Sequence, residues 1–230
     1  MTILKVLSAG AVKRGVSQIA AEFERTTGTR VTVDFATGPE VRKRVAAGEA
    51  ADVIVVPPAI MDEFGKQGKI VADSRAFVGR SRMGVVIHAD APTPGLGETA
   101  AFKKILLGAT AVIYNQASSG LYAAKLMEKL GLKDDLGSKT VVVQSGAAVM
   151  EYVAEHPGAI GLAQISEVMV MIDKGCLVKL AAPLPDAIQN ETSYDAAATV
   201  SGAAHAAARG LARALTSPEA KKVFAATGIS

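Results

Sequence analysis

The stretch that decides the fold of this chain is Val6-Leu7-Ser8-Ala9-Gly10-Ala11-Val12. Its first two residues end an apolar run, and small residues follow before an amphipathic segment begins at about Val12. This pattern predicts a buried strand that passes through a tight turn into a helix. Such a turn directs backbone N–H groups, which have no acceptor inside the helix, into one small volume.

Similar turns recur at residues 36–40, 115–121 and 144–147, each between a predicted strand and a predicted helix. In open α/β sheets, ligands bind at the edge where strands end and helices begin. Each interaction of an exposed helix N-terminus with negative charge contributes about 0.3–1 kcal/mol. We interpret the four turns as the walls of one binding site. Small residues at these places are equally suited to ordinary tight βα connections, so both interpretations stand at this point.

The composition is typical of a globular protein. The 230 residues are enough for one large domain or two small ones, and 50% are hydrophobic while 20% are charged. With no Trp and only 4% aromatic residues, the core must consist mainly of Ala, Val, Ile and Leu. The net charge of +3 is too weak to indicate nucleic-acid binding.

The sequence offers no metal site and no cofactor motif. A single cysteine, Cys176, excludes an intrachain disulfide and a thiolate cluster. The three histidines, His88, His156 and His205, do not have the spacing of metal ligands. We therefore expect neither a metal nor a cofactor.

No apolar stretch is long enough to span a membrane, and the N-terminus does not have the pattern of a signal peptide. Lys5 interrupts the only apolar run there, and Lys13 and Arg14 follow it, whereas a signal peptide has its charge first. Two explanations remain open. The chain stays in the cytoplasm, or it is a mature sequence to which a start Met was added.

Up to about residue 68, predicted strands alternate with predicted helices, which is the signature of a parallel α/β sheet. The strands are expected at 3–7, 30–35 and 52–56, and the helices at about 12–28, 37–48 and 60–68. The run at 52–56 is continuously apolar, as in a central strand covered on both faces. Thr37 and Glu40 form a possible capping box at the start of the second helix.

Residues 76–88 change this pattern: they suggest two short strands, 76–78 and 83–87, with a crossing between domains near 80–86. A second series of strands and helices follows. Its elements are expected at 99–106, 111–114, 120–130, 141–143, 147–156, 159–163, 168–174 and 177–180. After a loop at 181–194, a strand at 196–200 returns to the first domain, and helices at about 203–215 and 217–228 close the chain. We therefore expect two lobes, residues 1–82 with 196–230 and residues 83–195.

The sequence gives little support for catalysis. It contains neither a Gly-x-Ser-x-Gly nucleophile motif nor a phosphate-binding loop. Asp52 is best explained as the start of a strand. Ser118 and Ser119 precede a helix, so each is a candidate N-cap and a candidate ligand hydroxyl.

Charged residues flank two of the turns. Lys13 and Arg14 lie in the first turn of a predicted helix, where the helix dipole disfavours cations. They are either solvated or attract an anion toward the site. Glu40 argues the other way, because it already places negative charge at a helix N-terminus.

Several short motifs occur in a characteristic order along almost the whole chain. They are Leu7-Ser8-Ala9-Gly10-Ala11-Val12, Phe35-Ala36-Thr37-Gly38, Ala46-Ala47-Gly48-Glu49-Ala50-Ala51-Asp52-Val53, Ser119-Gly120-Leu121-Tyr122, Gly158-Ala159-Ile160-Gly161, and Ser217-Pro218-Glu219-Ala220 with Val223-Phe224 and Gly228. In these motifs the sequence resembles the molybdate-type extracellular solute-binding proteins of ABC importers. The resemblance implies the α/β, two-lobed type II periplasmic binding protein fold, in which each lobe is a mainly parallel sheet flanked by helices.

Three positions depart from this family. Its molybdate binders hold the oxyanion with two serines and a tyrosine, where this chain has Ala11, Gly38 and Gln164. A charge-assisted hydrogen bond contributes about 1.5–3 kcal/mol, and affinity changes tenfold for about every 1.4 kcal/mol. The fold and the binding role are therefore expected here, whereas molybdate as the ligand is disfavoured. Ala11 and Gly38 are also expected to leave a roomier site, which favours a different or larger ligand.

The leading hypothesis is a non-enzymatic, monomeric, periplasmic solute-binding protein that closes on a small anionic ligand in a cleft between the lobes. The hinges are expected at about 83–87 and 192–197, and the expected partner is an ABC permease, with no nucleic acid and no membrane insertion. The candidate ligand contacts are Ala9, Gly10, Ala11, Thr37, Gly38, Ser118, Ser119, Ser145, Gly146 and Gln164. Two alternatives remain: a cytoplasmic ligand sensor on the same fold, and an enzyme.

Overall fold

The computed structural model describes residues 3–202 and 206–230. The chain divides into two compact units, residues 1–81 with 192–230 (unit 1) and residues 82–191 (unit 2). The chain passes from one unit to the other within two strands, β4 (Ala76–His88) and β9 (Glu191–Ala198). The return passage lies at Thr192, ahead of the predicted boundary at 196.

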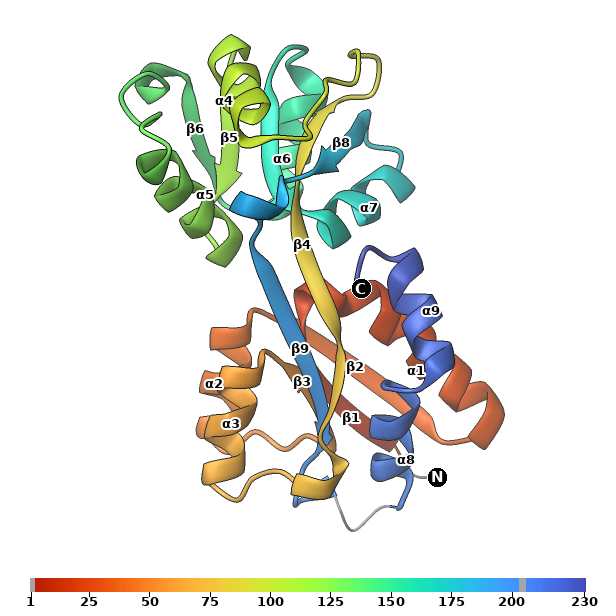
Figure 1. The fold of residues 1–230 in the computed structure, drawn as a ribbon. Coiled ribbons are helices and arrows are strands. Elements are labelled where there is room, and N and C mark those ends of the chain that lie inside the picture. Colours follow the sequence, from red (N-terminus) through yellow and green to blue (C-terminus); the bar gives the residue numbers. More distant parts are fainter. Residues whose placement is uncertain (1–2, 203–205) are drawn as a thin grey trace. The chain divides into compact units, whose positions relative to one another are not determined.

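Unit 1 is an α/β structure in which helices cover a sheet that contains the strand order β2-β1-β3-β9. Its elements are β1 (Ile3–Ala9), η1 (Gly10–Val12), α1 (Lys13–Thr27), β2 (Arg30–Ala36), α2 (Gly38–Ala46), β3 (Val53–Val56), α3 (Pro58–Lys66), η2 (Ala72–Ser74), the first part of β4, most of β9, α8 (Ala206–Ala214) and α9 (Pro218–Ala226). Strand β1 pairs in parallel with β2 and β3, and β9 pairs antiparallel with β3. Helices α2 and α3 lie on one side of this sheet, and α1, α8 and α9 lie on the other (Figure 1).

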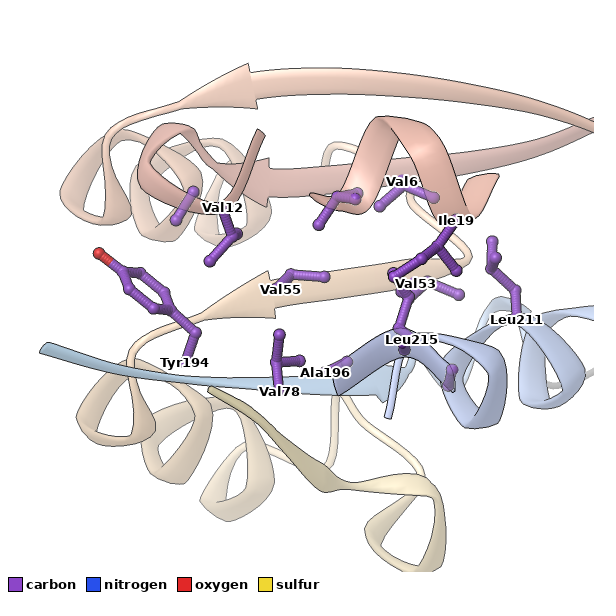
Figure 2. Close-up of a cluster of buried hydrophobic side chains, with 14 of the residues drawn as sticks. Val6, Val12, Ile19, Val53, Val55, Val78, Tyr194, Ala196, Leu211 and Leu215 are labelled. Atoms are coloured by element: carbon purple, nitrogen blue, oxygen red, sulfur yellow. The ribbon is translucent and has the colours of Figure 1, made fainter. Parts of the chain in front are cut away.

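The short strand β3 confirms the prediction of a central strand covered on both faces. All its residues are buried. Val53 and Val55 belong to the apolar cluster under α1 and α8, as Figure 2 shows, whereas its other two residues belong to the cluster under α2 and α3. A strand with apolar neighbours on both faces has no polar alternation, which is why its sequence is a continuous apolar run.

Unit 2 repeats this layer architecture. Its elements are α4 (Thr99–Gly108), β5 (Val112–Asn115), α5 (Ser118–Lys129), η3 (Gly137–Lys139), β6 (Thr140–Val143), α6 (Gly146–Glu155), β7 (Ile160–Gln164), α7 (Ile165–Asp173), β8 (Val178–Pro183) and η4 (Asp186–Ile188), together with the second part of β4. The strand order is β4-β7-β5-β6, with β8 paired to β4. Strand β5 is parallel to both β6 and β7, and β4 is antiparallel to β7 and β8. Helices α4 and α5 cover one face, and α6 and α7 cover the other (Figure 1).

Several predicted element boundaries are wrong. Residues 76–88 form one continuous strand, because Arg80 exchanges backbone hydrogen bonds with Ser230, at the far end of the chain, with N–O distances of 2.6 and 2.9 Å. The predicted loop at 181–194 instead contains the end of β8, the turn η4 and the start of β9. Helix α4 begins at Thr99 as expected, with Glu98 as its N-cap residue, but it continues to Gly108. The first residues of the predicted helix at 203–215 lie outside the described residues.

An ion-pair cluster in unit 1 predicts a pH dependence of stability. Glu49 accepts hydrogen bonds from Arg44 Nε and from Lys5 Nζ, both at 2.6 Å. These bonds, that of Arg44 first, lower the pKa of the Glu49 carboxyl from 4.5 to about 2. The stabilisation is therefore fully present above pH 4.5 and is lost as the pH falls through about 2. We expect Glu49→Gln to lower the urea midpoint at pH 7, and expect this deficit to shrink in acid as the wild-type carboxyl protonates.

The matched control for this prediction is Glu155→Gln. Glu155 is exposed at the end of α6 and makes no ion pair within the part of the chain that the structure describes. The urea midpoint of the Glu155→Gln variant should equal that of the wild type at every pH. A Glu49→Gln deficit of the same size in neutral and acidic buffer would contradict the assignment.

Candidate functional site: the helix N-termini at the strand ends

In unit 1 the parallel pairing brings three strand ends to one edge of the sheet. Ala9 lies opposite Ala36 in the β1–β2 register, and β3 ends beside β1. Each of the three strands leads into a helix that starts within two residues, namely η1, α2 and α3. The predicted contacts Ala9, Gly10, Ala11, Thr37 and Gly38 all lie in the first two of these turns. They therefore come together at one edge.

Apolar neighbours lie close to Gly38 and Ala11. A Cβ at position 38 would lie 3.1 Å from Ile60 Cδ1 and 3.3 Å from Pro57 Cδ. Ala11 packs against the apolar cluster under α1 and α8. Neighbouring apolar groups thus lie in these two side-chain directions, and the prediction that Ala11 and Gly38 leave a roomier ligand site stays a prediction. What the two turns can offer a ligand is their backbone N–H groups.

The electrostatics of this edge are mixed. Lys13 Nζ lies 5.3 Å from the centroid of the Phe35 ring, near the end of β2, where a cation–π contact holds the charge. Thr37 caps α2 by accepting a hydrogen bond from the Glu40 N–H at 3.3 Å, which confirms one half of the predicted capping box. Glu40 is exposed in the first turn of α2. A cation is thus fixed at this edge, and the nearby carboxylate is free to remain in solvent.

Unit 2 gathers strand ends in the same way. Strand β5 runs parallel to β6 and β7, so their carboxyl ends share one edge, and the helices α5, α6 and α7 begin there. The predicted contacts Ser118, Ser119, Ser145, Gly146 and Gln164 lie at these starts or within the first turn. Each helix N-terminus carries partial positive charge, which makes the edge suited to an anion.

The start of α5 is organised by Asn115, a residue that sequence reasoning missed. Its Oδ1 accepts the N–H groups of Ala117 at 2.9 Å and Gly120 at 3.2 Å. The hydroxyl of the buried Ser119 also bonds to the Asn115 side chain. Neither Ser118 nor Ser119 caps the helix, whose N-cap is Ala117, so the capping interpretation of the two serines is wrong. The exposed Ser118 hydroxyl is left available to solvent or a ligand.

The starts of α6 and α7 differ in character. Ser145 caps α6 by accepting the Ala148 N–H at 3.2 Å. Helix α7 begins at Ile165, three residues before its predicted start, so Gln164 is its N-cap residue. Gln164 is only 6% exposed, and its Oε1 is buried without a hydrogen-bond partner among the described residues.

Glu167 is a second group that the sequence did not reveal. It lies in the first turn of α7, and its Oε2 is buried without a hydrogen-bond partner in the described part of the chain. Burial raises the pKa of this carboxyl. A Cβ at position 146 would overlap the Glu167 carboxyl, so this side chain lies directly against the first residue of α6. The sequence did not indicate Glu167 as a first-turn residue, because residues 165–167 were expected outside the helix.

Within residues 3–202 and 206–230, no group of three or more His, Cys, Asp or Glu side chains is arranged to hold a metal ion. None of the described helices is both long and apolar enough to cross a lipid bilayer. The structure thus presents two edges of helix N-termini, one in each unit.

Two α/β units joined through two strands, with strand ends leading into helix N-termini, define the class of type II periplasmic binding proteins. The chain belongs to the bacterial extracellular solute-binding protein family, whose model matches residues 4–230. It is 27% identical over 237 residues to an aconitate isomerase from Pseudomonas sp., covering 100% of this chain and 88% of that protein. It is 21% identical over 232 residues to the molybdate-binding protein ModA of Escherichia coli, covering 99% and 88%.

Solved structures show the same fold. A substrate-binding domain assigned to a molybdenum ABC transporter of Clostridium difficile superposes with a TM-score of 0.81 at 18% identity, over 100% of this chain and 99% of that one. At this level of identity the likeness establishes the fold and leaves the ligand to be argued from the site.

Proposed function

We propose that this protein is the monomeric, periplasmic solute-binding component of an ABC importer and captures a small organic anion between its two units. The observation that carries the proposal is the gathering of helix N-termini at one strand-end edge in each unit. The two edges are proposed to form opposite walls of one cleft that closes by hinge motion at about 83–87 and 192–197. An ABC permease is the proposed partner of the closed form.

An organic anion suits the site better than a tetrahedral oxyanion. Ala11, Gly38 and Gln164 lack the hydroxyls with which the family's molybdate binders hold their ligand. Helix N–H groups bind carboxylates as well as tetrahedral oxyanions, so a carboxylate does not depend on the hydroxyls that this chain lacks. The 27% identical relative is by its name an aconitate isomerase, and aconitate is a tricarboxylate.

Isothermal titration calorimetry tests the proposal directly. We expect aconitate, citrate or malate to bind with 1:1 stoichiometry, and expect molybdate, tungstate and sulfate to give no comparable heat. The physical reason is the number of acceptor oxygens matched to helix N–H groups, together with the missing hydroxyl donors. Tight binding of molybdate, with no heat of binding for the organic acids, would contradict the organic-anion assignment and support an oxyanion as the ligand.

A matched variant separates specific binding from general electrostatics. Lys13→Gln removes the cation near the end of β2. The variant should lower the affinity for every anion to a similar degree. Lys221→Gln removes an exposed cation of α9 that is outside both edges, and it should leave affinity unchanged. The difference between the two variants should narrow in high salt, because salt screens exposed charges.

A second candidate function is isomerisation of an unsaturated carboxylic acid. The aconitate isomerase relative favours it, because the match covers 100% of this chain. In a 1,3-proton shift, the methylene carbon loses a proton, its electron pair forms a new double bond, and the former double bond takes a proton at its far carbon. No co-reactant is needed. Incubation with trans-aconitate in D2O, followed by NMR, decides the matter: deuterated cis-aconitate supports an enzyme, and unchanged substrate supports a binding protein.

A further inference from the structure

The carboxyl of Glu167 lies where a solute anion is proposed to bind. It is in the first turn of α7, and it lies against Gly146, the first residue of α6, so closely that a Cβ there would overlap it. The first-turn N–H groups of α6 are among the proposed contacts of the solute. The Oε2 atom is buried and accepts no hydrogen bond from any described residue.

The charged groups on the surrounding elements do not compensate for this carboxylate. Helix α6 carries Glu151 and Glu155, β8 carries Lys179, and α7 itself carries Asp173. No ion pair of Glu167 with any of these groups occurs in the described residues, and burial is the cause that raises its pKa. None of the described basic side chains, Lys179 included, is thus paired with the ionised form of Glu167.

Gln164 gives an independent sign that a partner is missing. It is only 6% exposed, yet its Oε1 is buried without a partner among the described residues. Its position as the N-cap of α7 places it one helical turn before Glu167. Buried polar atoms in native proteins are nearly always hydrogen-bonded. Two unpartnered acceptor oxygens in one turn indicate that a hydrogen-bond donor is missing from this place, and a proton on Glu167 would be such a donor.

We propose that binding of an anionic solute takes up one proton onto Glu167, whose neutral carboxyl then donates a hydrogen bond to a carboxylate of the solute at the N-terminus of α6. The inference rests on the proposed function, namely the binding of an organic anion at this edge. The proton comes from solvent and adds to one carboxylate oxygen, and no other bond changes. Two carboxylates within hydrogen-bond distance cannot both stay ionised in a buried site, so one of them holds a proton.

Proton uptake makes affinity depend on pH. Where Glu167 is ionised in the free protein and protonated in the complex, each pH unit upward weakens binding about tenfold. In Glu167→Gln the carboxamide is a permanent donor of similar shape, so binding persists and this pH dependence disappears. The same variant also abolishes the uptake of a proton.

Calorimetric titration of aconitate, citrate and malate in phosphate and in Tris, at matched pH, counts the protons taken up, because the two buffers differ in ionisation enthalpy. The wild type needs no mutation for this count, and the expected result is that uptake rises toward one proton per solute as the pH is raised and Glu167 ionises in the free protein. Glu167→Gln should bind with no uptake of this proton. Glu219→Gln, which changes an exposed first-turn glutamate of α9, should behave as the wild type.

The outcomes separate the two claims. Binding of any of these acids with the same heat in both buffers overturns the proton-uptake inference and leaves the proposed function intact. Equal uptake by the wild type and by a Glu167→Gln variant shown to be folded by circular dichroism also overturns it. Absence of heat with all three acids overturns the proposed function and this inference with it.

Discussion

Replacing Phe224 by alanine is expected to destabilise unit 1 by about 3–5 kcal/mol. Phe224 is 1% exposed on α9, and its ring fills the space that Gly15 leaves on α1, where a Cβ would overlap the ring. The substitution removes the ring from this apolar cluster, and the paired helices α1 and α9 can close the cavity only in part. Small domains have a total stability of about 5–15 kcal/mol, so the loss is a large share of it.

Urea unfolding followed by far-UV circular dichroism measures this loss, since the chain has no Trp to report by fluorescence. Phe77→Ala is the matched control. Phe77 is 42% exposed on β4, so this substitution removes a ring of equal size from the surface. Its midpoint should stay close to that of the wild type. Equal midpoints for the two variants would show that the α1–α9 contact contributes little.

The second large effect is expected at Gly120. A Cβ at this position would overlap the backbone carbonyl carbon and oxygen of Asn115, so the backbone itself must move. We expect Gly120→Ala to destabilise unit 2 by about 1–3 kcal/mol through overpacking. Because Asn115 Oδ1 holds the Ala117 and Gly120 N–H groups at the start of α5, affinity for the solute should also fall more than tenfold.

Gly108→Ala is the control for this variant. Gly108 ends α4, and apart from its own stretch of helix no described residue has an atom within 4 Å of the position that its Cβ would take. Alanine there should leave affinity unchanged and raise stability slightly, because it lowers the entropy of the unfolded chain. If the Gly120→Ala and Gly108→Ala proteins have the same affinity for the solute and the same stability, the turn at Asn115 tolerates displacement of its backbone.

Most of the strand and helix order was predictable from the sequence. The apolar run of β3 and the helices expected at about 12–28, 120–130 and 217–228 were predicted and confirmed; Ser217 caps the last of these, and left-handed Gly28 and Gly131 follow the first two. These features are local: a cap or a left-handed glycine acts within one turn of the chain. Ala11, Gly38 and Gln164, which replace the family's ligand residues, were also identified from the sequence. These replacements led to the organic-anion proposal.

The failures share a different cause. Strand β4 was expected to break near Arg80, but the backbone of Arg80 is paired with Ser230, which is distant in the sequence. The start of α7 was placed three residues late, which hid both the capping position of Gln164 and the buried Glu167. Neither the periodicity of a segment nor its composition records which distant backbone completes its hydrogen bonds.

The sequence by itself determined the order of strands and helices and which residues stand at the strand ends, since both follow from local periodicity and turn chemistry. Only the tertiary structure decided what occupies the space in front of those residues. Ile60 and Pro57 close the side-chain direction at Gly38, and the Glu167 carboxyl closes it at Gly146. The physical reason is that the volume around a Cβ is filled by side chains from other turns of the chain, whose approach is set by packing between elements.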